Sequence, residues 1–254
     1  MDIYGLIGKN LEHSFSPDYF NKKFQKKNIN AEYRIFELDS IDEFPTLLAD
    51  NPEIKGLNVT IPFKRAMGQF MNFIDEPVNI TGSTNAIRIT RNNNSTFLSA
   101  YNTDILGFEK TIKQVLKKRK IIEAIILGTG GSANSIAYVL RKLGIMFSYV
   151  TRNPSRLMHT HYSWVTKEKI RQNLLIINTT PMGMYPNINS YPNIPYEFIT
   201  KNHILYDLVY NPTETLFIKK GKEQGATCIN GQKMLEIQAE ASWNIWTKKD
   251  NRFF

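Results

Sequence analysis

A glycine-rich turn between an apolar segment and a helical pattern constrains the fold of this chain most strongly. The run Gly128-Thr129-Gly130-Gly131-Ser132-Ala133 follows the apolar stretch 121–127 and opens the helical pattern. Glycines permit a tight turn and let backbone amides approach a pyrophosphate, which a helix N-terminus stabilises. An apolar strand, a glycine turn and a helix in this order predict a Rossmann-like nucleotide-binding domain.

The end of the next apolar segment indicates which nucleotide is bound. Segment 145–150 ends where such domains usually carry an acid for the ribose, but Thr151, Arg152, Asn153 and, slightly later, Arg156 stand there. A carboxylate would repel a 2′-phosphate, whereas guanidinium groups bind one. The sequence therefore predicts NADP as the cofactor in preference to NAD.

Composition places the chain among globular proteins. With 254 residues, 42% of them apolar, it can form two domains with real cores. No apolar run approaches the roughly 20 residues needed to cross a bilayer, and residues 1–5 lack a signal-peptide layout, so we expect a soluble cytoplasmic protein without a membrane partner. Cys228 is the sole cysteine, which excludes an intrachain disulfide and a cysteine-based metal site. The nearest histidine pair, His159 and His161, is expected in a solvated loop, and no metal is predicted.

The net charge of +9 raises the possibility of a nucleic-acid partner. The lysines are spread in short clusters at 22–23, 26–27, 117–120 and 219–220, which we interpret as solvated faces of amphipathic helices. A nucleic-acid-binding module would concentrate its charge with aromatic side chains on one face. We therefore expect no nucleic acid. A basic surface also attracts an anionic cofactor and a carboxylate substrate, so charge alone does not choose among partners.

The first hundred residues alternate strand and helix. Strands are expected at 3–8, 31–38 and 56–60 and helices at about 17–28 and 41–49, which predicts a parallel sheet. Ser16 is expected to cap the first helix with Pro17 at its first position. Segments 86–90 and 96–100 predict a hairpin.

The remainder of the chain predicts a second domain and a returning helix. A helix at about 103–118 should bridge the domains, strands are expected at 174–178 and 203–208, and the final helix at about 231–247 carries Gln238 on its apolar stripe. The fold class is α/β: an N-terminal α/β substrate domain of residues 1–101, completed by the helix 232–254, and a Rossmann-like NADP domain of residues 102–231. The cleft between the domains is the expected reaction site.

Two charged residues are candidates for proton transfer. Segment 56–64 predicts a strand ending at Thr60 and then a helix with Pro62 first, which places Lys64 in a first turn, where the helix dipole disfavours a cation. Such a placement suggests an acid–base role, although a lysine extending into solvent is the simpler alternative. Asp104 opens the bridging helix, where capping alone would also explain an acid. If the two domains face each other, this amine and this carboxyl group can meet at one substrate hydroxyl.

Many ordered segments resemble one known family. They are Tyr4-Gly5-Leu6-Ile7-Gly8 with Ser14-Phe15-Ser16-Pro17, Asn58-Val59-Thr60-Ile61-Pro62-Phe63-Lys64, Gly82-Ser83-Thr84-Asn85-Ala86, Asn102-Thr103-Asp104, the glycine turn, Asn178-Thr179-Thr180-Pro181-Met182-Gly183-Met184, Tyr206-Asp207-Leu208-Val209-Tyr210-Asn211-Pro212-Thr213, and Gly231 with Met234, Leu235, Gln238 and Ala239. Together they make the chain similar to the shikimate dehydrogenases from its first strand to its last helix.

The resemblance implies an NADP-dependent oxidoreductase that reversibly reduces 3-dehydroshikimate to shikimate, in chorismate and aromatic amino-acid biosynthesis. It makes Lys64 and Asp104 the catalytic pair, with Lys64 passing the proton and Asp104 holding the substrate hydroxyl and the lysine. Substrate binding is implied for Ser14 and Ser16 at the carboxylate and for Asn58, Thr60, Asn85, Asp104, Tyr210 and Gln238 at the ring. Cofactor binding is implied for Gly128, Thr129, Gly130, Gly131, Ser132, Ala133, Thr151, Arg152, Asn153, Arg156, Thr180, Met182, Leu208, Gly231 and Glu76.

The chain departs from the family pattern at two places. Ile105 stands where a glycine usually follows the Asn-Thr-Asp motif, and the 2′-phosphate segment is Thr151-Arg152-Asn153 where many members have Asn-Arg-Thr. The first change alters the domain junction without removing the acid. The second makes contact by Arg152 better supported than contact by its two neighbours.

Two alternative functions compete with this interpretation. A quinate/shikimate dehydrogenase using NAD or both cofactors predicts an acid near position 152, and none is present. A non-catalytic paralogue that binds metabolite and nucleotide would be free to lose Lys64 or Asp104, and both are retained. Among partners we expect the small-molecule substrate and, at most, a second copy of the chain, since the sequence is compatible with a monomer or a homodimer.

Overall fold

The computed structural model describes residues 1–12, 14–92, 95–116 and 119–248. The described chain forms two compact units, one of residues Met1–Thr103 together with the chain from Gln238 onward, and one of residues Asp104–Ile237. We call them the first and the second unit. The end of the expected bridging helix, 117–118, and the last six residues of the expected substrate domain lie outside the described residues. Among the described residues, no helix is both long and apolar enough to span a bilayer.

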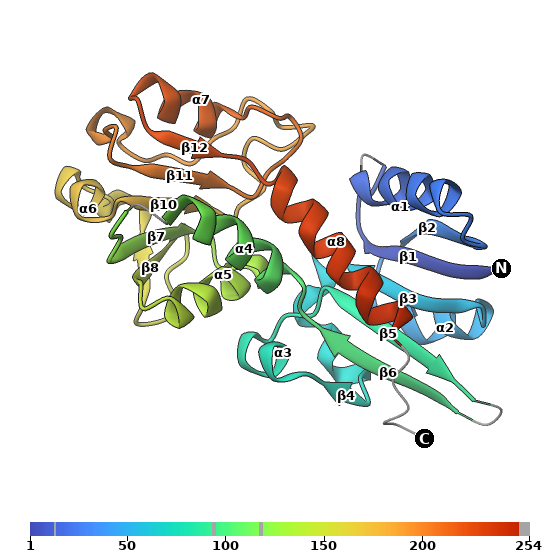
Figure 1. Cartoon of the computed structure of the whole chain (residues 1–254). Coiled ribbons are helices and arrows are strands. Elements are labelled where there is room, and N and C mark those ends of the chain that lie inside the picture. The colour runs from blue at the N-terminus through green and yellow to red at the C-terminus, as the bar shows by residue number, and fades with distance from the viewer. Residues whose placement is uncertain (13, 93–94, 117–118, 249–254) are drawn as a thin grey trace. The chain divides into compact units, whose positions relative to one another are not determined.

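The first unit is built on a six-stranded mixed sheet with the order β2-β1-β3-β5-β6-β4 (Figure 1). Strand β1 lies between β2 and β3 and is parallel to both, as the alternating pattern predicts, and β5 and β6 form the predicted antiparallel hairpin. The strands are β1 (Asp2–Gly8), β2 (Ala31–Glu37), β3 (Ile54–Val59), β4 (Phe73–Ile74), β5 (Ala86–Arg91) and β6 (Thr96–Tyr101). The helices are α1 (Phe15–Lys26), α2 (Phe44–Asp50) and α3 (Glu76–Thr81), with short 3-10 helices η1 (Ile41–Glu43), η2 (Phe63–Arg65) and η3 (Met67–Phe70).

An aromatic core joins the sheet of the first unit to the end of the C-terminal helix α8 (Gln232–Thr247). The ring of Trp246 stacks on Tyr4 at 5.1 Å, and its indole N–H donates to the carbonyl of Ile87 at 3.0 Å. Gly56 makes this packing possible, because a Cβ there would lie 2.4 Å from the indole ring. The C-terminal helix therefore completes the fold of the first unit.

The first helix begins earlier than the sequence predicts. Its N-cap is Ser14, whose hydroxyl accepts from the backbone N–H of Ser16 at 3.4 Å, so the predicted cap at Ser16 is wrong. Pro17 sits inside the first turn rather than at its first position. That turn tolerates proline because its N–H groups have no partner within the helix.

The segment that carries Lys64 also differs from the prediction, since no α-helix begins at Pro62. The chain instead makes 3-10 helix η2, in which the N–H of Ala66 donates to Phe63 at 2.9 Å. The carbonyl of Lys64, which an α-helix would use internally, accepts from the N–H of Thr84 at 2.8 Å. This tertiary bond replaces the helical one. The expected effect of a helix dipole on Lys64 is therefore wrong, because a three-residue helix has no developed dipole.

The second unit contains a six-stranded sheet that is parallel throughout, with the order β12-β11-β10-β7-β8-β9 (Figure 1). Its strands are β7 (Glu123–Leu127), β8 (Met146–Thr151), β9 (His159–His161), β10 (Leu175–Asn178), β11 (Ile204–Asp207) and β12 (Thr227–Ile229). Its helices are α4 (Asp104–Leu116), α5 (Gly131–Lys142), α6 (Lys167–Gln172), α7 (Leu216–Glu223) and the start of α8, with 3-10 helices η4 (Tyr162–Trp164) and η5 (Tyr196–Phe198).

Both faces of this parallel sheet are buried, as such sheets require. On one face Ile126 packs with the apolar residues of α4 and α5, and on the other Ile125 packs with those of α6 and α7. His159 and His161 form the edge strand β9, so their expected place in a solvated loop is wrong. The strand pairs in parallel with β8, and the His159 ring packs edge-on against Tyr149 with centroids 5.4 Å apart.

The strand order of the second unit reverses direction between β7 and β10. The chain runs outward from β7 through β8 to β9 and then returns to add β10, β11 and β12 on the other side. In open parallel sheets, ligands bind beyond the carboxyl ends of the strands at such a reversal. The topology therefore directs attention to the residues that follow β7 and β10, and it confirms the predicted Rossmann-like fold.

Candidate functional site

The glycine turn follows β7 and leads directly into α5. Gly128 has φ +107°, a conformation that favours glycine, and a Cβ there would lie 2.7 Å from Oγ1 of Thr179. Gly130 occupies the N-cap of α5 without any side chain to cap the helix, and a Cβ added there would meet nothing within 4 Å. The turn thus combines close packing on its inner side with open space at the helix start, which fits an anionic ligand.

The ends of β7 and β10 are bound to each other beside this turn. The backbone N–H of Thr179 donates to the carbonyl of Leu127 at 3.0 Å, and its hydroxyl donates to the same oxygen at 2.7 Å. Thr179 therefore joins the ends of β7 and β10 at the point where the strand order reverses. This arrangement places two predicted cofactor segments, 128–133 and 180–182, at one edge of the sheet.

The predicted 2′-phosphate segment leaves the sheet at the end of β8. Thr151 closes the strand, and its hydroxyl accepts from the N–H of Asn153 at 3.3 Å, so it shapes the turn. Arg152 and Arg156 are both exposed. Burial first and the charge of Arg156 second lower the pKa of the neighbouring His159. The segment is thus a positively charged, solvent-accessible turn.

Asn178, the last residue of β10, organises the next predicted cofactor segment. Its Oδ1 accepts from the backbone N–H of Thr180 at 3.1 Å and from the Thr180 hydroxyl at 2.6 Å. Its Nδ2 donates to the carbonyl of Met182 at 3.3 Å and to Asp207 at 2.9 Å. One buried carboxamide therefore shapes the whole 180–182 segment.

Asp207 ends β11 and is fully buried. Its Oδ1 accepts from Asn178 and from the N–H of Val209, at 2.9 and 3.0 Å, and its Oδ2 accepts from the hydroxyl of Thr215 at 2.6 Å. Burial raises the pKa of Asp207 to about 6, although all three hydrogen bonds oppose that rise. A titratable group at neutral to mildly acidic pH thus lies inside the second unit.

Leu208 and Gly231 are packed together by a close backbone approach. A Cβ at Gly231 would lie 2.1 Å from the carbonyl oxygen of Leu208, and the N–H of Gly231 donates to the carbonyl of Val209 at 3.1 Å. The N–H of Leu208 in turn donates to the carbonyl of Asn178 at 3.0 Å. Hydrogen bonds and packing therefore link the four predicted cofactor residues Thr180, Met182, Leu208 and Gly231.

The first unit holds a separate polar network around Asn58. Its Nδ2 donates to the carbonyl of Asn85 at 3.0 Å and to the hydroxyl of Ser242 at 2.9 Å, and its Oδ1 accepts from the hydroxyl of Tyr33 at 2.9 Å. Both amide hydrogens of Asn58 are thus directed at protein partners. Burial, its largest cause, raises the pKa of Tyr33 well above its usual range, so its phenol stays a hydrogen-bond donor.

Asn85 extends this network to the residue before Asp104. Its Oδ1 accepts from the backbone N–H of Thr103 at 2.7 Å, and its Nδ2 donates to the Thr103 hydroxyl at 3.0 Å. Oε1 of Gln238 accepts from that hydroxyl at 3.2 Å and from Asn85 at 3.4 Å. Asn85 and Gln238, two predicted substrate residues, therefore fix the position of Thr103. Thr103 immediately precedes Asp104, a buried residue that begins α4.

The remaining predicted residues occupy strand ends and helix starts. Thr60 follows β3, and Lys64 is half-buried in η2. Ser14 and Ser16 lie at the start of α1, and Tyr210 is half-buried after β11 in the second unit. Glu76 is exposed in the first turn of α3 in the first unit.

Residues 6–87 match the family described as the shikimate dehydrogenase substrate binding domain. Over 251 residues, which cover 95% of each chain, the sequence is 38% identical to the shikimate dehydrogenase (NADP(+)) of Clostridium botulinum. It is 32% identical over 265 residues to the protein of the same name from Caldanaerobacter subterraneus, covering 96% of this chain and 91% of that relative.

The chain belongs to the shikimate dehydrogenase family.

Solved structures agree with this assignment. Shikimate dehydrogenase 1 from Peptoclostridium difficile superposes with a TM-score of 0.82 at 33% identity, covering 99% of this chain and 94% of that one. A shikimate dehydrogenase in complex with NADP+ superposes with a TM-score of 0.84 at 28% identity, covering 97% and 90%. The resemblance inferred from the motifs is confirmed.

The sequence motifs of a shikimate dehydrogenase did not single out every residue that the structure brings into these networks. Tyr33, Thr103 and Ser242 form hydrogen bonds with predicted site residues but were given no role. Asp207 and Thr215, also given no role, are linked to Thr180 and Met182 through Asn178. Ser242 had a usable signal, because it lies four positions after Gln238 and so shares its face of α8. The contributions of Tyr33 and Thr215 depend on strand and helix neighbours that no local pattern specifies.

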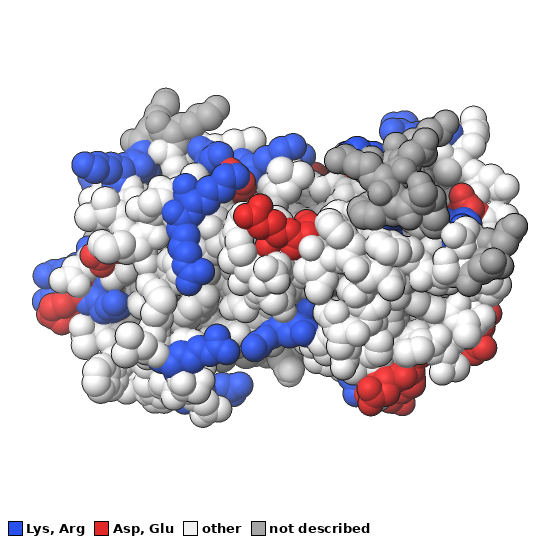
Figure 2. All heavy atoms as spheres, turned by 90° about the horizontal axis from the view of Figure 1, so that it is seen from below, with Lys and Arg blue, Asp and Glu red and all other residues white. Residues whose placement is uncertain are grey.

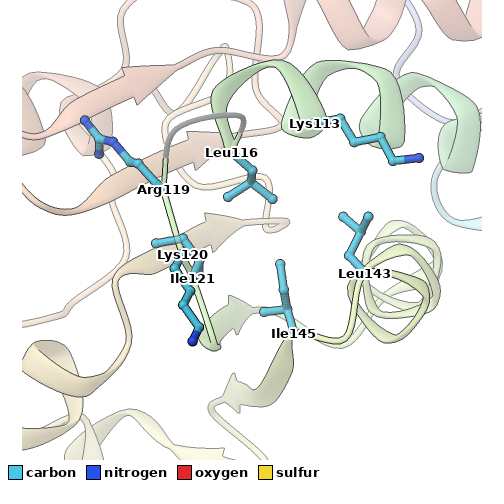
Figure 3. Close-up of a pocket in the computed structure, with 7 residues that line it drawn as sticks. All are labelled: Lys113, Leu116, Arg119, Lys120, Ile121, Leu143 and Ile145. Atoms are coloured by element: carbon cyan, nitrogen blue, oxygen red, sulfur yellow. The ribbon is translucent and has the colours of Figure 1, made fainter.

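A surface groove of about 310 Å³ in the second unit contains none of the predicted site residues. Leu116, Leu143 and Ile145 line its floor, while the charged ends of Lys113 and Arg119 point outward (Figure 3). Lys113 pairs with Glu109, and Arg119 donates to Thr227 at 2.8 Å. Both cations are thus bound to neighbouring residues of the second unit.

The charged side chains are dispersed on the face that Figure 2 shows. Lys and Arg side chains lie there in several separate groups with uncharged surface between them, and Asp and Glu appear on the same face. Within the described residues, no group of three or more His, Cys, Asp or Glu is arranged to hold a metal ion.

Proposed function

We propose that this chain is an NADP-dependent shikimate dehydrogenase that reversibly reduces 3-dehydroshikimate to shikimate. The observation that carries the proposal is the identity of 38% over 95% of the chain to a relative named for this activity. The glycine turn at the reversal point of the parallel sheet supports the cofactor, and the exposed Arg152 and Arg156 support a 2′-phosphate.

The residues of the second unit fit NADP. The open N-cap at Gly130 leaves room for a pyrophosphate at the start of α5, which Gly128 to Ala133 would hold. The adenosine end of NADP would be held by Thr151, Arg152, Asn153 and Arg156. The nicotinamide end would be held by Thr180, Met182, Leu208 and Gly231, with Glu76 of the first unit as an additional contact. When bound, NADPH supplies the hydride for the carbonyl carbon of the substrate.

Lys64 and Asp104 are the proposed catalytic pair. During reduction the ammonium group of Lys64 donates its proton to the carbonyl oxygen as that oxygen gains negative charge, so the hydroxyl forms and the amine is left neutral. Asp104 accepts a hydrogen bond from a substrate hydroxyl and orients the lysine. Its place is supported by Thr103, whose N–H and hydroxyl are both bonded to Asn85.

Ser14, Ser16, Thr60, Asn85, Tyr210 and Gln238 are the proposed ligands of the carboxylate and ring hydroxyls. Asn58 acts with them chiefly by holding Asn85 and Ser242, because both of its amide hydrogens have protein partners. We retain residues 1–101 with 232–254 as the proposed substrate domain and residues 102–231 as the proposed NADP domain.

The test follows NADPH absorbance with purified protein. Shikimate with NADP should give rapid reduction of the cofactor, and the same protein should be far slower with NAD or with quinate. Comparable rates with quinate and NAD would instead support the quinate/shikimate alternative, and binding of both ligands without turnover would support a non-catalytic paralogue. Light scattering tests the proposed monomer or homodimer, and a fluorescent fusion tests the proposed cytoplasmic location.

A further inference from the structure

A buried carboxylate in the second unit has no part in the proposed chemistry. Asp207 accepts hydrogen bonds from three segments: Asn178 at the end of β10, Val209 after β11, and Thr215 at the start of α7. Burying a charged group is costly unless hydrogen bonds compensate. A carboxylate kept here at that cost points to a role beyond packing.

Asn178 transmits the position of this carboxylate to the cofactor segment. The same amide nitrogen that donates to Asp207 also donates to the carbonyl of Met182, while the amide oxygen accepts two bonds from Thr180. On the other side, the backbone carbonyl of Asn178 accepts from the N–H of Leu208. Asp207 is therefore linked to two of the four residues proposed for one end of NADP, Thr180 and Met182, through the side chain of Asn178, and the backbone of the same residue holds a third, Leu208.

Thr215 fixes which hydrogen-bonding role the side chain at position 207 must play. Its hydroxyl donates to Oδ2 of Asp207 at 2.6 Å and accepts from the N–H of Ile218 at 3.3 Å, so its single hydrogen is committed to the carboxylate. An amide at position 207 would present hydrogens to that hydroxyl and leave the threonine hydrogen without an acceptor. The arrangement thus requires an acceptor-only group at position 207.

We propose that Asp207, Asn178 and Thr215 form a positioning unit that sets segments 180–182 and 208–209 in the conformation that binds NADP. None of the three touches the reacting atoms, so they are positioning residues and not catalytic residues. The inference rests on the proposed cofactor role of Thr180, Met182 and Leu208. It predicts that damage to the unit appears in cofactor affinity and leaves the affinity for shikimate intact.

The experiment compares four single variants of the full chain. Asp207→Asn and Thr215→Val each remove one feature of the unit, and Thr215→Ser keeps the hydroxyl as a conservative rescue. Thr111→Val is the matched control, because it deletes another buried hydroxyl of the second unit. That hydroxyl is bonded to Tyr206 at 2.7 Å on the other face of the sheet. NADPH affinity is measured directly by fluorescence titration, alongside the KM values for NADP and shikimate and the melting temperature.

We expect Asp207→Asn and Thr215→Val to weaken NADPH binding by about tenfold, the loss of one charge-assisted hydrogen bond, with the KM for shikimate changed by less than about twofold. Thr215→Ser should retain the NADPH affinity of the wild type. Thr111→Val should lower the melting temperature but leave the NADPH affinity unchanged. Equal loss of NADPH affinity in Thr111→Val, or wild-type affinity in both Asp207→Asn and Thr215→Val, would overturn the proposal. If Asp207→Asn fails to fold, the comparison of Thr215→Val with Thr215→Ser decides. Wild-type protein that binds NADPH but does not oxidise shikimate would instead refute the proposed function.

Discussion

Two glycines of the same turn should respond in opposite ways to an added methyl group. Gly128 has φ +107°, and a Cβ there would lie 2.7 Å from Oγ1 and 3.0 Å from Cγ2 of the threonines that follow β10. Gly130 has φ −76°, which alanine adopts freely, and its Cβ would meet no protein atom within 4 Å. The turn therefore separates a substitution that strains the protein from one that only fills empty space.

The magnitudes follow from these two environments. Gly128→Ala forces a left-handed conformation, costing about 1–3 kcal/mol, and adds an overlap with Thr179 that the hydrogen bond of Thr179 to Leu127 resists. We expect a loss of unfolding free energy of about 3 kcal/mol. Gly130→Ala should cost no more than about 1 kcal/mol, the difference between glycine and alanine at an N-cap. Its methyl group nevertheless enters the space we assign to the pyrophosphate, so NADPH binding should fall by about a hundredfold or more, since anion contacts at a helix start depend on close backbone approach.

Urea unfolding and NADPH fluorescence titration measure the two effects on the same samples. The expected pattern is a destabilised Gly128→Ala and a stable Gly130→Ala that no longer binds the cofactor. Gly144→Ala is a useful control, because φ there is +69° but no neighbour lies within 4 Å of its Cβ, so it reports backbone strain alone. A Gly130→Ala protein with wild-type NADPH affinity would refute the assignment of this turn to the pyrophosphate.

Three further outcomes are expected. Lys64→Ala should lower kcat by at least about a thousandfold with little change in the affinity for shikimate, because proton transfer acts in the transition state; normal turnover with a poorer KM would make the lysine a binder only. Arg152→Ala should raise the KM for NADP by about tenfold or more while leaving NAD unchanged, and equal losses for both would remove the 2′-phosphate assignment. The third concerns Asp207, whose pKa of about 6 lies above that of an aspartate in the unfolded chain. As the pH falls, the folded protein therefore takes up the proton at a higher pH than the unfolded chain does. The contribution of Asp207 to stability is then greatest below about pH 4 and falls by up to roughly 3 kcal/mol as the pH rises through 6. Urea unfolding at several pH values should show that slope in the wild type and lose it in Asp207→Asn. Tyr196 stays neutral over this range, because burial first and the charge of Asp207 second raise its pKa.

Local patterns predicted the regular elements well where periodicity and apolar runs decide them. The parallel strands of the first unit, its hairpin, the strand before the glycine turn and the helix after it all appear close to the expected positions. Short elements held by tertiary contacts escaped prediction, among them β4, α3, α7 and β12. Elements of two to eight residues carry too little periodic pattern to stand out from loops.

A hydrogen bond from a distant segment explains one wrong prediction, and a competing local signal explains another. The expected helix at Pro62 yields to η2 because the carbonyl of Lys64 bonds to Thr84 rather than to its own helix. The helix cap moves from Ser16 to Ser14 because both serines offer the same local signal. In both cases the sequence supplied a plausible local structure, and a tertiary contact or a competing neighbour selected another.

The sequence by itself determined the family and the strand, glycine turn and helix of a Rossmann-like fold, because these depend on residue types at fixed short spacings. Only the tertiary structure decided which buried polar groups are joined. Asn58 meets Ser242 across 184 positions, and Asn178 meets Asp207 across 29. A buried polar side chain must find a partner, and strand order and helix packing, which no local spacing encodes, determine which partner is within reach.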